Sequence, residues 1–115
     1  MLSLTSSVRI FVCTQPTDMR RGFDGLGRMV EDLIKEDPFS GHLFVFINRR
    51  QDRTKILYWD RDGFGLWYKR LEQGTFRRPT SEAAHVEMTP TELSLLLGGI
   101  DLAHTRRRKR YRKKN

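Results

Sequence analysis

The chain has 115 residues, of which 37% are hydrophobic, and a formal net charge of +8 at pH 7; this allows one domain with a core of modest size and favours a polyanionic partner. No apolar run reaches the about 18 residues that span a bilayer, and Met1–Arg9 lacks the pattern of a signal peptide, so we expect a cytoplasmic protein. Cys13 is the only cysteine, which excludes an internal disulfide and favours a buried, apolar side chain.

The first two elements are predicted from side-chain spacing. Val8–Val12 is a β-branched and aromatic run that ends at a proline-containing turn and predicts a strand. After Asp24, apolar residues recur at the spacing of one helix face, and Asp37–Pro38 is expected to end this helix. A short carboxylate, either Asp18 or Asp24, is expected to cap its first turn. The apolar positions are Leu26, Met29, Val30, Leu33 and Ile34.

Three further strands are predicted in the middle of the chain. His42–Asn48 contains an unbroken apolar run, typical of a central strand that is buried on both faces. Lys55–Trp59 is expected to pair with it as a hairpin. The pattern of Phe64–Leu71 fits both a strand and a helix, and we expect a strand that bends into a short helix closed by Gly74.

The C-terminal part contains the clearest predicted element. Phe76–Thr80 is expected to cross the surface, and His85–Met88 to return as an edge strand. A helix then begins with Thr89 as N-cap, Pro90 at its first position and Glu92 reaching back to the cap, which is the pattern of a capping box. The leucines expected to face the core are Leu93, Leu96 and Leu97, before Gly98–Gly99.

These elements predict an α+β fold with one compact domain over residues 1–105 and a basic tail over residues 106–115. The domain is expected to contain a mostly antiparallel sheet of about four to five strands with two main helices packed on it. Residues 1–105 carry 14 basic and 14 acidic side chains, so the whole net charge lies in the tail. This charge density predicts disorder and attraction to nucleic acid without sequence choice. The tail's basic residues are Arg106, Arg107, Arg108, Lys109, Arg110, Arg112, Lys113 and Lys114.

Four basic pairs lie in the otherwise neutral domain: Arg20–Arg21, Arg49–Arg50, Lys69–Arg70 and Arg77–Arg78. Folding can gather them on one face, where arginine forks to phosphate oxygens, or leave them as ordinary solvated charge. Four large aromatic side chains either stack on nucleobases or pack in the core. Packing in the core is the simpler interpretation. These aromatic residues are Trp59, Trp67, Tyr68 and Phe76.

Catalysis and metal binding find little support. Asp60 and Asp62 can be imagined as paired carboxylates that hold a divalent metal, but a hairpin turn explains the Asp-Gly step more simply. His42, His85 and His104 lack the spacing of metal ligands. We therefore expect no catalytic residues, no metal and no cofactor.

Three motifs carry a family resemblance, Pro16–Leu26, Asp62–Glu72 and Gly74–Phe76, and the closing segment Leu95–Asp101 extends it. They resemble, in the same order, the transposase-B accessory protein, which is encoded by the second open reading frame of the insertion-sequence-sixty-six family of bacterial transposable elements. The likeness covers about Val8–Asp101 and omits the tail. Gly65 and Thr75 are the positions within it where variation is expected.

The resemblance implies a small, non-enzymatic protein that acts beside the element's transposase, which performs the cutting and joining. DNA and this transposase are the expected partners, with no membrane, and the protein would associate with the nucleoid in the cytoplasm. An exposed edge strand, at the start of the chain or near Val86, would permit a homodimer. Three alternatives stay open: an adaptor for the transposase whose tail alone attracts DNA, a metal-dependent nuclease, and an RNA-binding module.

Two sets of candidate site residues follow. The DNA-binding set consists of Arg20, Arg21, Lys69 and Arg70 together with the basic residues of the tail. Arg20 and Arg21 precede the first predicted helix, whose free amides favour anions. The candidate partner surface consists of Asp18, Met19, Trp67, Tyr68 and Phe76. The motif that contains Arg20–Arg21 and the motif that contains Trp67–Arg70 are expected to build one shared surface.

Overall fold

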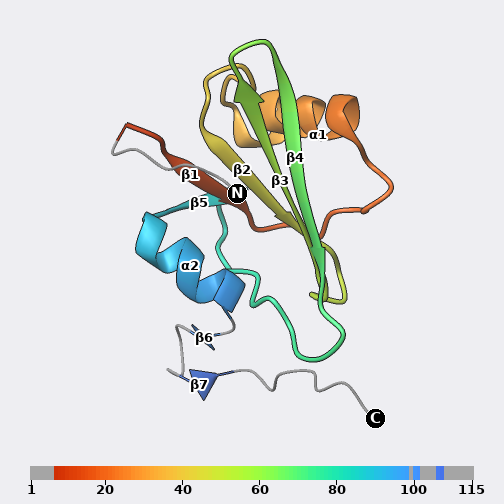
Figure 1. The fold of residues 1–115 in the computed structure, drawn as a ribbon, viewed down its shortest axis with the longest axis vertical. Coiled ribbons are helices and arrows are strands. Elements are labelled where there is room, and N and C mark those ends of the chain that lie inside the picture. Colours follow the sequence, from red (N-terminus) through yellow and green to blue (C-terminus); the bar gives the residue numbers. More distant parts are fainter. Residues whose placement is uncertain (1–6, 99, 102–105, 108–115) are drawn as a thin grey trace.

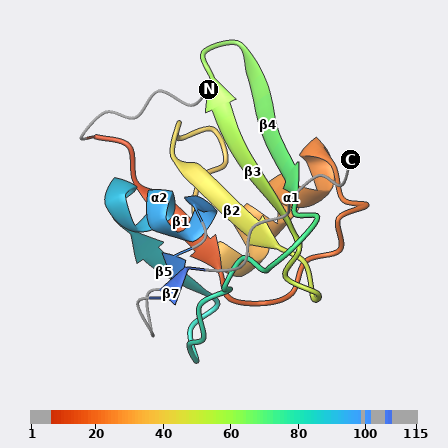
Figure 2. The same ribbon diagram turned by 60° about the horizontal axis from the view of Figure 1, so that its bottom comes forward.

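A five-stranded sheet with the order β4-β3-β2-β1-β5 forms the centre of the computed structural model, which describes residues 7–98, 100–101 and 106–107 (Figure 1 and Figure 2). β1 and β2 are parallel, and every other neighbouring pair in this sheet is antiparallel. The α+β prediction with a mostly antiparallel sheet is confirmed. The strands are β1 (Ile10–Cys13), β2 (Leu43–Ile47), β3 (Arg53–Asp60), β4 (Gly63–Arg70) and β5 (His85–Met88).

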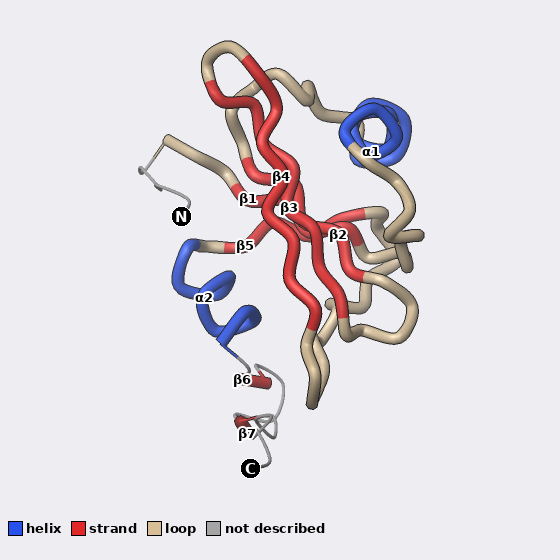
Figure 3. The backbone as a smooth tube through the Cα atoms, turned by 45° about the vertical axis from the view of Figure 1, so that its right-hand side comes forward, coloured by secondary structure: helices blue, strands red, loops and turns tan. Residues whose placement is uncertain are grey.

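Helices cover both faces of the sheet. α1 (Phe23–Met29) continues into a π-helical turn, η1 (Val30–Ile34), and this pair packs on one face, whereas α2 (Pro90–Gly98) packs on the other (Figure 3). Each face has its own buried cluster because side chains alternate along the strands. The cluster under α1 contains Phe11, Phe44, Phe46, Leu57, Leu26, Val30 and Ile34. The cluster under α2 contains Ile10, Val12, Val45, Ile47, Ile56, Phe76, Leu93 and Leu96.

The predicted central strand is confirmed, because β2 is buried along its whole length and lies in the middle of the sheet. Cys13 is fully buried, as expected. β1 is an interior strand, so the suggestion that the first strand offers a free edge is wrong. The edges among the described residues are β4 and β5, and β5 contains Val86.

The helical segment before β2 matches the prediction except at its cap. Gly22 is the N-cap and receives no side-chain hydrogen bond, so neither Asp18 nor Asp24 caps the helix. The carboxylate of Asp18 instead accepts from the backbone N–H of Arg20 over 2.9 Å, inside the preceding loop. Lys35 then ends the helical segment in a left-handed conformation (φ 65°), shortly before the predicted stop at Asp37–Pro38.

β4 corrects one prediction. The segment from Gly63 to Arg70 is a regular strand, and every residue in it pairs with β3, so the expected bend into a helix is wrong. The helix-like spacing arises because the aromatic residues of β4 serve both faces of the sheet. Phe64 packs on the cluster under α1, whereas Trp67 packs on the cluster under α2. Long-range pairing has overridden an ambiguous local pattern.

The C-terminal elements contain one confirmed motif and one correction. Thr89 N–H donates to the Glu92 carboxylate over 3.0 Å, and Glu92 N–H donates to Thr89 Oγ1 over 3.1 Å, which confirms the capping box. Phe76 is fully buried, so the segment after it crosses the surface only from Arg77 onward. Two short strands, β6 (Ile100–Asp101) and β7 (Arg106–Arg107), pair antiparallel. The prediction of a disordered tail falls mainly on residues 108–115, which lie outside the described residues.

Candidate nucleic-acid interface

The four basic pairs of the domain share one end of the sheet: three lie on loops, and Lys69–Arg70 forms the end of β4. Because β1 and β2 are parallel, both end there, and their antiparallel neighbours bring the start of β3, the start of β5 and the end of β4 to the same place. We call residues 14–22, 48–53 and 69–84 the basic end. It contains nine basic residues and four acidic ones. The basic residues are Arg20, Arg21, Arg49, Arg50, Arg53, Lys69, Arg70, Arg77 and Arg78, and the acidic ones are Asp18, Asp52, Glu72 and Glu82.

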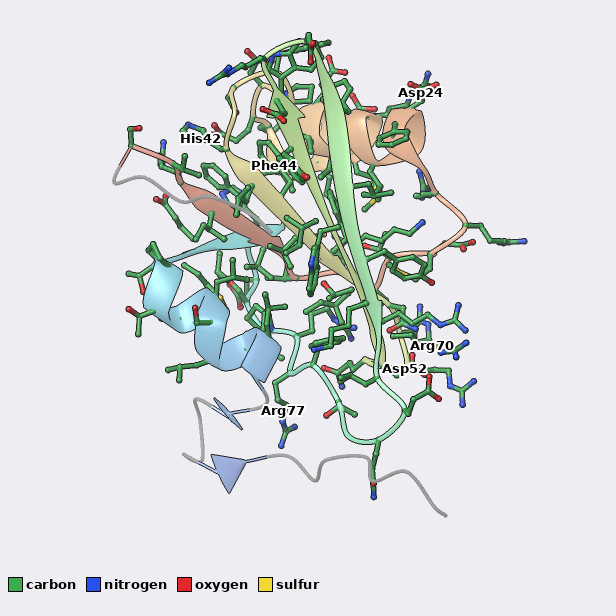
Figure 4. All side chains as sticks on the ribbon, viewed as in Figure 1. Asp24, His42, Phe44, Asp52, Arg70 and Arg77 are labelled. Carbon is green, nitrogen blue, oxygen red and sulfur yellow. The ribbon has the colours of Figure 1, made fainter. Side chains whose placement is uncertain are left out.

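The view of the side chains shows the position of this end. Arg70, the last residue of β4, and Asp52, just before β3, lie at the lower ends of these strands, with Arg77 on the loop below, whereas His42 lies at the opposite end of the sheet (Figure 4). Residues 1–105 are neutral as a whole, so the excess of positive charge here is balanced by an excess of negative charge elsewhere in the domain. The topology of the chain therefore gathers positive charge at one end of a domain that is neutral as a whole.

Backbone hydrogen bonds hold the three loops of the basic end together. Thr17 N–H donates to the carbonyl of Ile47 over 3.0 Å, which joins the first loop to the end of β2. Phe76 N–H donates to the carbonyl of Gln51 over 2.6 Å, and the Gln51 side chain accepts from Arg78 N–H over 2.8 Å. The basic end is thus a connected structure rather than three independent loops.

The turn between β2 and β3 is fixed by Asn48. Its side-chain oxygen accepts from the backbone N–H groups of Asp52 and Arg53, both over 3.0 Å, and its amide donates to the Asp52 carboxylate over 2.7 Å. Gln51 has a left-handed backbone (φ 61°) within the same turn. Arg49 and Arg50, at the tip of the turn, are exposed.

Lys55 is a buried residue that holds part of the basic end in place and that the sequence-based predictions did not include. It lies in β3 with only 7% of its surface exposed, and its ammonium group donates to the carbonyl oxygens of Met19 (2.7 Å) and Arg21 (2.9 Å). The same ammonium lies 4.8 Å from the centre of the Tyr68 ring. Lys55 therefore links the loop that carries Arg20–Arg21 to β4. A lysine between Thr54 and Ile56 in an apolar strand was the signal that was available.

Arg78 also has a structural role. Its guanidinium donates to the carbonyl oxygen of Asn48 over 2.7 Å. Partial burial lowers the pKa of Arg78, and the positive charge of the nearby Arg49 lowers it further. The positive charges of Arg49 and Arg78 therefore repel each other.

Two exposed arginines of the basic end form an ion pair with an acidic side chain. Arg20 pairs with Asp18 over 2.6 Å and lowers the pKa of that carboxyl to about 2, whereas Arg70 pairs with Glu72 over 2.8 Å. Within the described part of the chain, four exposed cations of the basic end form no ion pair, namely Arg21, Arg49, Arg50 and Lys69. These are the side chains most available to a phosphate group.

A cleft of about 400 Å³ separates the first two loops of the basic end. Pro16, Thr17, Asp18 and Met19 line one side, and Asn48, Arg49 and Arg50 line the other. The cleft thus contains the candidate residues Asp18 and Met19 beside a basic pair that did not belong to the predicted DNA-binding set.

The structure divides the predicted site residues among several places. Tyr68 and Arg70 lie with Arg53 on the face of the sheet that α1 covers, and Lys55 links them to the loop of Arg20 and Arg21. Lys69 alternates to the other face, where Trp67 and Phe76 pack in the cluster under α2. Of the tail residues, Arg106 and Arg107 lie in β7, and the others lie outside the described residues.

Residues considered for catalysis lie away from the basic end. Asp60 and Asp62 flank the turn between β3 and β4, at the opposite end of the sheet. Among the residues that the structure describes, no three His, Cys, Asp or Glu side chains are placed to hold a metal ion. The described helices include none with the length and apolar character needed to cross a membrane.

Comparison with known proteins identifies related sequences. The family model described as IS66 Orf2 like protein matches residues 8–107. Two uncharacterized proteins of Sinorhizobium fredii are similar: y4jC is 40% identical over 94% of this chain and 92% of its own length, and y4hO is 39% identical over 90% of each. No solved structure matches the chain.

Proposed function

Because the chain belongs to the IS66 Orf2 like family of insertion-sequence proteins, we propose that it is a non-enzymatic accessory protein of DNA transposition that binds DNA through the basic end. The observation that carries the proposal is the convergence of four basic pairs at one end of the sheet. Duplex DNA presents a dense row of phosphates, so a surface with this excess of cations attracts it at long range.

The exposed cations of the basic end are suited to phosphate contacts. Arg21, Arg49 and Arg50 offer guanidinium groups, which bind phosphate oxygens with two parallel hydrogen bonds. The hydrogen bonds of Asn48, Gln51 and Lys55 hold the loops in place before DNA arrives, so less conformational entropy is lost on binding. Such contacts position the protein on DNA without reading its sequence. The basic tail adds further nonspecific attraction.

Binding of the full chain to a fluorescently labelled duplex, measured by anisotropy over a series of salt concentrations, tests this proposal. The affinity should fall with salt at a logarithmic slope of about −0.9 for each phosphate contacted. Removing one contact reduces the slope by about 1, so Arg49→Ala with Arg50→Ala should weaken binding and reduce the slope by about 2. The matched control is Arg28→Ala with Arg61→Ala, which removes the same charge from exposed residues outside the basic end. Equal losses of DNA affinity in the two double variants would contradict the proposal.

A second candidate function, an adaptor for the transposase, is favoured by an aromatic cluster at the opposite end of the sheet. The rings of Phe39, Trp59 and Phe64 contact one another with centres 5.0–5.1 Å apart, and Phe39 is 56% exposed. Exposed aromatic side chains of this kind are typical anchors of protein interfaces. A protein that binds the transposase here and DNA at the basic end would bring the two together.

Retention of the protein on immobilised transposase after nuclease treatment tests the adaptor function. Phe39→Ala should release the protein, because it removes the exposed ring of the cluster. The matched control is Phe23→Ala, since Phe23 is 48% exposed at the start of α1. If both variants are retained as well as the unchanged protein, the aromatic cluster is not the docking surface.

A further inference from the structure

One aromatic side chain of this protein is placed to stack on a nucleobase. Of the four aromatic residues considered from the sequence, Phe76 is buried, Trp67 packs on the cluster under α2, and Trp59 lies between other rings at the far end. Tyr68 differs from them, because it is 47% exposed and lies near the basic end. The structure therefore separates one exposed ring from three that serve packing.

Tyr68 is held in place by two cations. The Lys55 ammonium lies 4.8 Å from the ring centre, and the guanidinium of Arg53 donates to the tyrosine hydroxyl over 3.1 Å. Because Lys55 is itself fixed by the carbonyl oxygens of Met19 and Arg21, the ring is supported from beneath by a buried group. Tyr68 lies on β4, an edge strand of the sheet, and about half of its surface remains exposed.

A further cation lies on the same face of the sheet as this ring. Arg53 pairs with Arg70 across the two strands, on the same face as Tyr68. An aromatic platform with arginines on its border is the arrangement by which proteins bind single strands: the base stacks on the ring and the phosphates contact the cations.

We propose that Tyr68 stacks on an unpaired base of single-stranded DNA, with Arg53 contacting the adjoining phosphate. Arg70, which pairs with Glu72, adds positive charge on the same face. The inference rests on the proposed DNA-binding function and adds the class of strand that this face of the basic end recognises. In a duplex both faces of each base are covered by neighbouring bases, so the ring of Tyr68 has nothing to stack on. The contribution of Tyr68 is therefore specific to single strands.

Anisotropy with the full chain and two labelled probes tests the proposal: a single strand of about 16 nucleotides, and the same sequence as a duplex. Loss of one stacked base corresponds to about 1–3 kcal/mol, so Tyr68→Leu should weaken single-strand binding by about 5-fold to 150-fold and leave duplex binding within about twofold. Tyr68→Phe keeps the ring and should retain most of the single-strand affinity. A 2-aminopurine base in the single strand should be quenched by the unchanged protein and by Tyr68→Phe.

Four outcomes would overturn the inference. If Tyr68→Leu binds the single strand as tightly as the unchanged protein, the ring does not stack on a base. If Tyr68→Leu loses affinity for the single strand and the duplex equally, the ring does not distinguish single-stranded from double-stranded DNA. Tighter binding of an RNA strand with the same sequence contradicts the assignment to DNA. Failure of the proposed function is seen separately, as absence of salt-dependent duplex binding by the unchanged protein. If Tyr68→Leu fails to fold, the 2-aminopurine signal still decides, because a base that neither the unchanged protein nor Tyr68→Phe quenches would overturn the inference.

Discussion

The ammonium group of Lys55 donates to the carbonyl oxygen of Met19 over 2.7 Å, although the two residues lie 36 positions apart. A second bond, to Arg21, fixes the same loop. A buried cation in a strand is costly unless its hydrogen bonds are satisfied, and here two backbone carbonyls and an aromatic ring satisfy them. The position of the loop that carries Arg20 and Arg21 is therefore coupled to the packing of β3.

Lys55→Met should destabilise the fold, because it leaves the carbonyl oxygens of Met19 and Arg21 without their donor. The expected loss is about 1–3 kcal/mol in the free energy of unfolding, measured by urea denaturation. Lys69→Met is the matched control, since Lys69 is an exposed lysine near the end of β4, and it should change stability by less than about 0.5 kcal/mol. Equal stability of the two variants would show that the Lys55 bonds contribute nothing.

The capping box of α2 should contribute measurably to stability. Thr89→Ala removes the hydroxyl that accepts from Glu92 N–H and should cost about 0.5–2 kcal/mol in the free energy of unfolding. Thr91→Ala, two residues later and exposed, serves as the control and should be close to neutral. Thermal melting of both variants would distinguish them, and a melting temperature unchanged by Thr89→Ala would contradict the role of the cap.

Gly65 is more constrained than the sequence indicates. A Cβ atom at this position would overlap the ring of Tyr58 on the neighbouring strand, whereas the space around Gly63 is open. Tyr58 packs against the cluster under α2, so Gly65→Ala must displace a partly buried ring. We expect a loss of about 1 kcal/mol or more for Gly65→Ala in urea denaturation. Gly63→Ala should cost less, and the opposite ranking would contradict the contact.

The pKa of Asp18 should respond to Arg20. Hydrogen bonds from Arg20 lower the pKa of Asp18 from 3.8 to about 2. A lowered carboxyl pKa in the folded state adds stability above the unfolded value of 3.8, and this is lost as the pH falls toward about 2. Titration of the Asp18 carboxyl carbon by NMR should give a midpoint near the lower value, and Arg20→Ala should raise it toward 3.8. A midpoint near 3.8 in the unchanged protein would exclude the pair in solution.

The sequence pattern predicted correctly those elements that depend only on residues close together in the chain. The capping box needs only Thr89 and Glu92 at the right spacing, and the burial of β2 follows from its unbroken apolar run. The strand character of Phe64–Leu71 could not be settled in this way, because it depends on pairing with β3. The failure of Asp18 as a cap has a similar reason, since its carboxylate is satisfied within its own loop.

The site was less predictable than the elements. The four basic pairs are visible in the sequence, but their convergence depends on the parallel pairing of β1 with β2, which brings two loops far apart in the chain to one end of the sheet. The role of Lys55 depends on contacts to residues more than 30 positions away. Both features are properties of the topology, and no local pattern encodes them.

Mapping of bound duplex DNA by NMR on the isotope-labelled full chain tests the central claim most directly. The claim predicts that the amide signals that shift belong to the basic end, residues 14–22, 48–53 and 69–84, with Arg49 and Arg50 among the largest changes. Signals from the loops at the opposite end, residues 35–42 and 60–62, should stay in place. Shifts confined to the tail, or shifts centred on the opposite end, would contradict the claim that the domain binds DNA through its basic end.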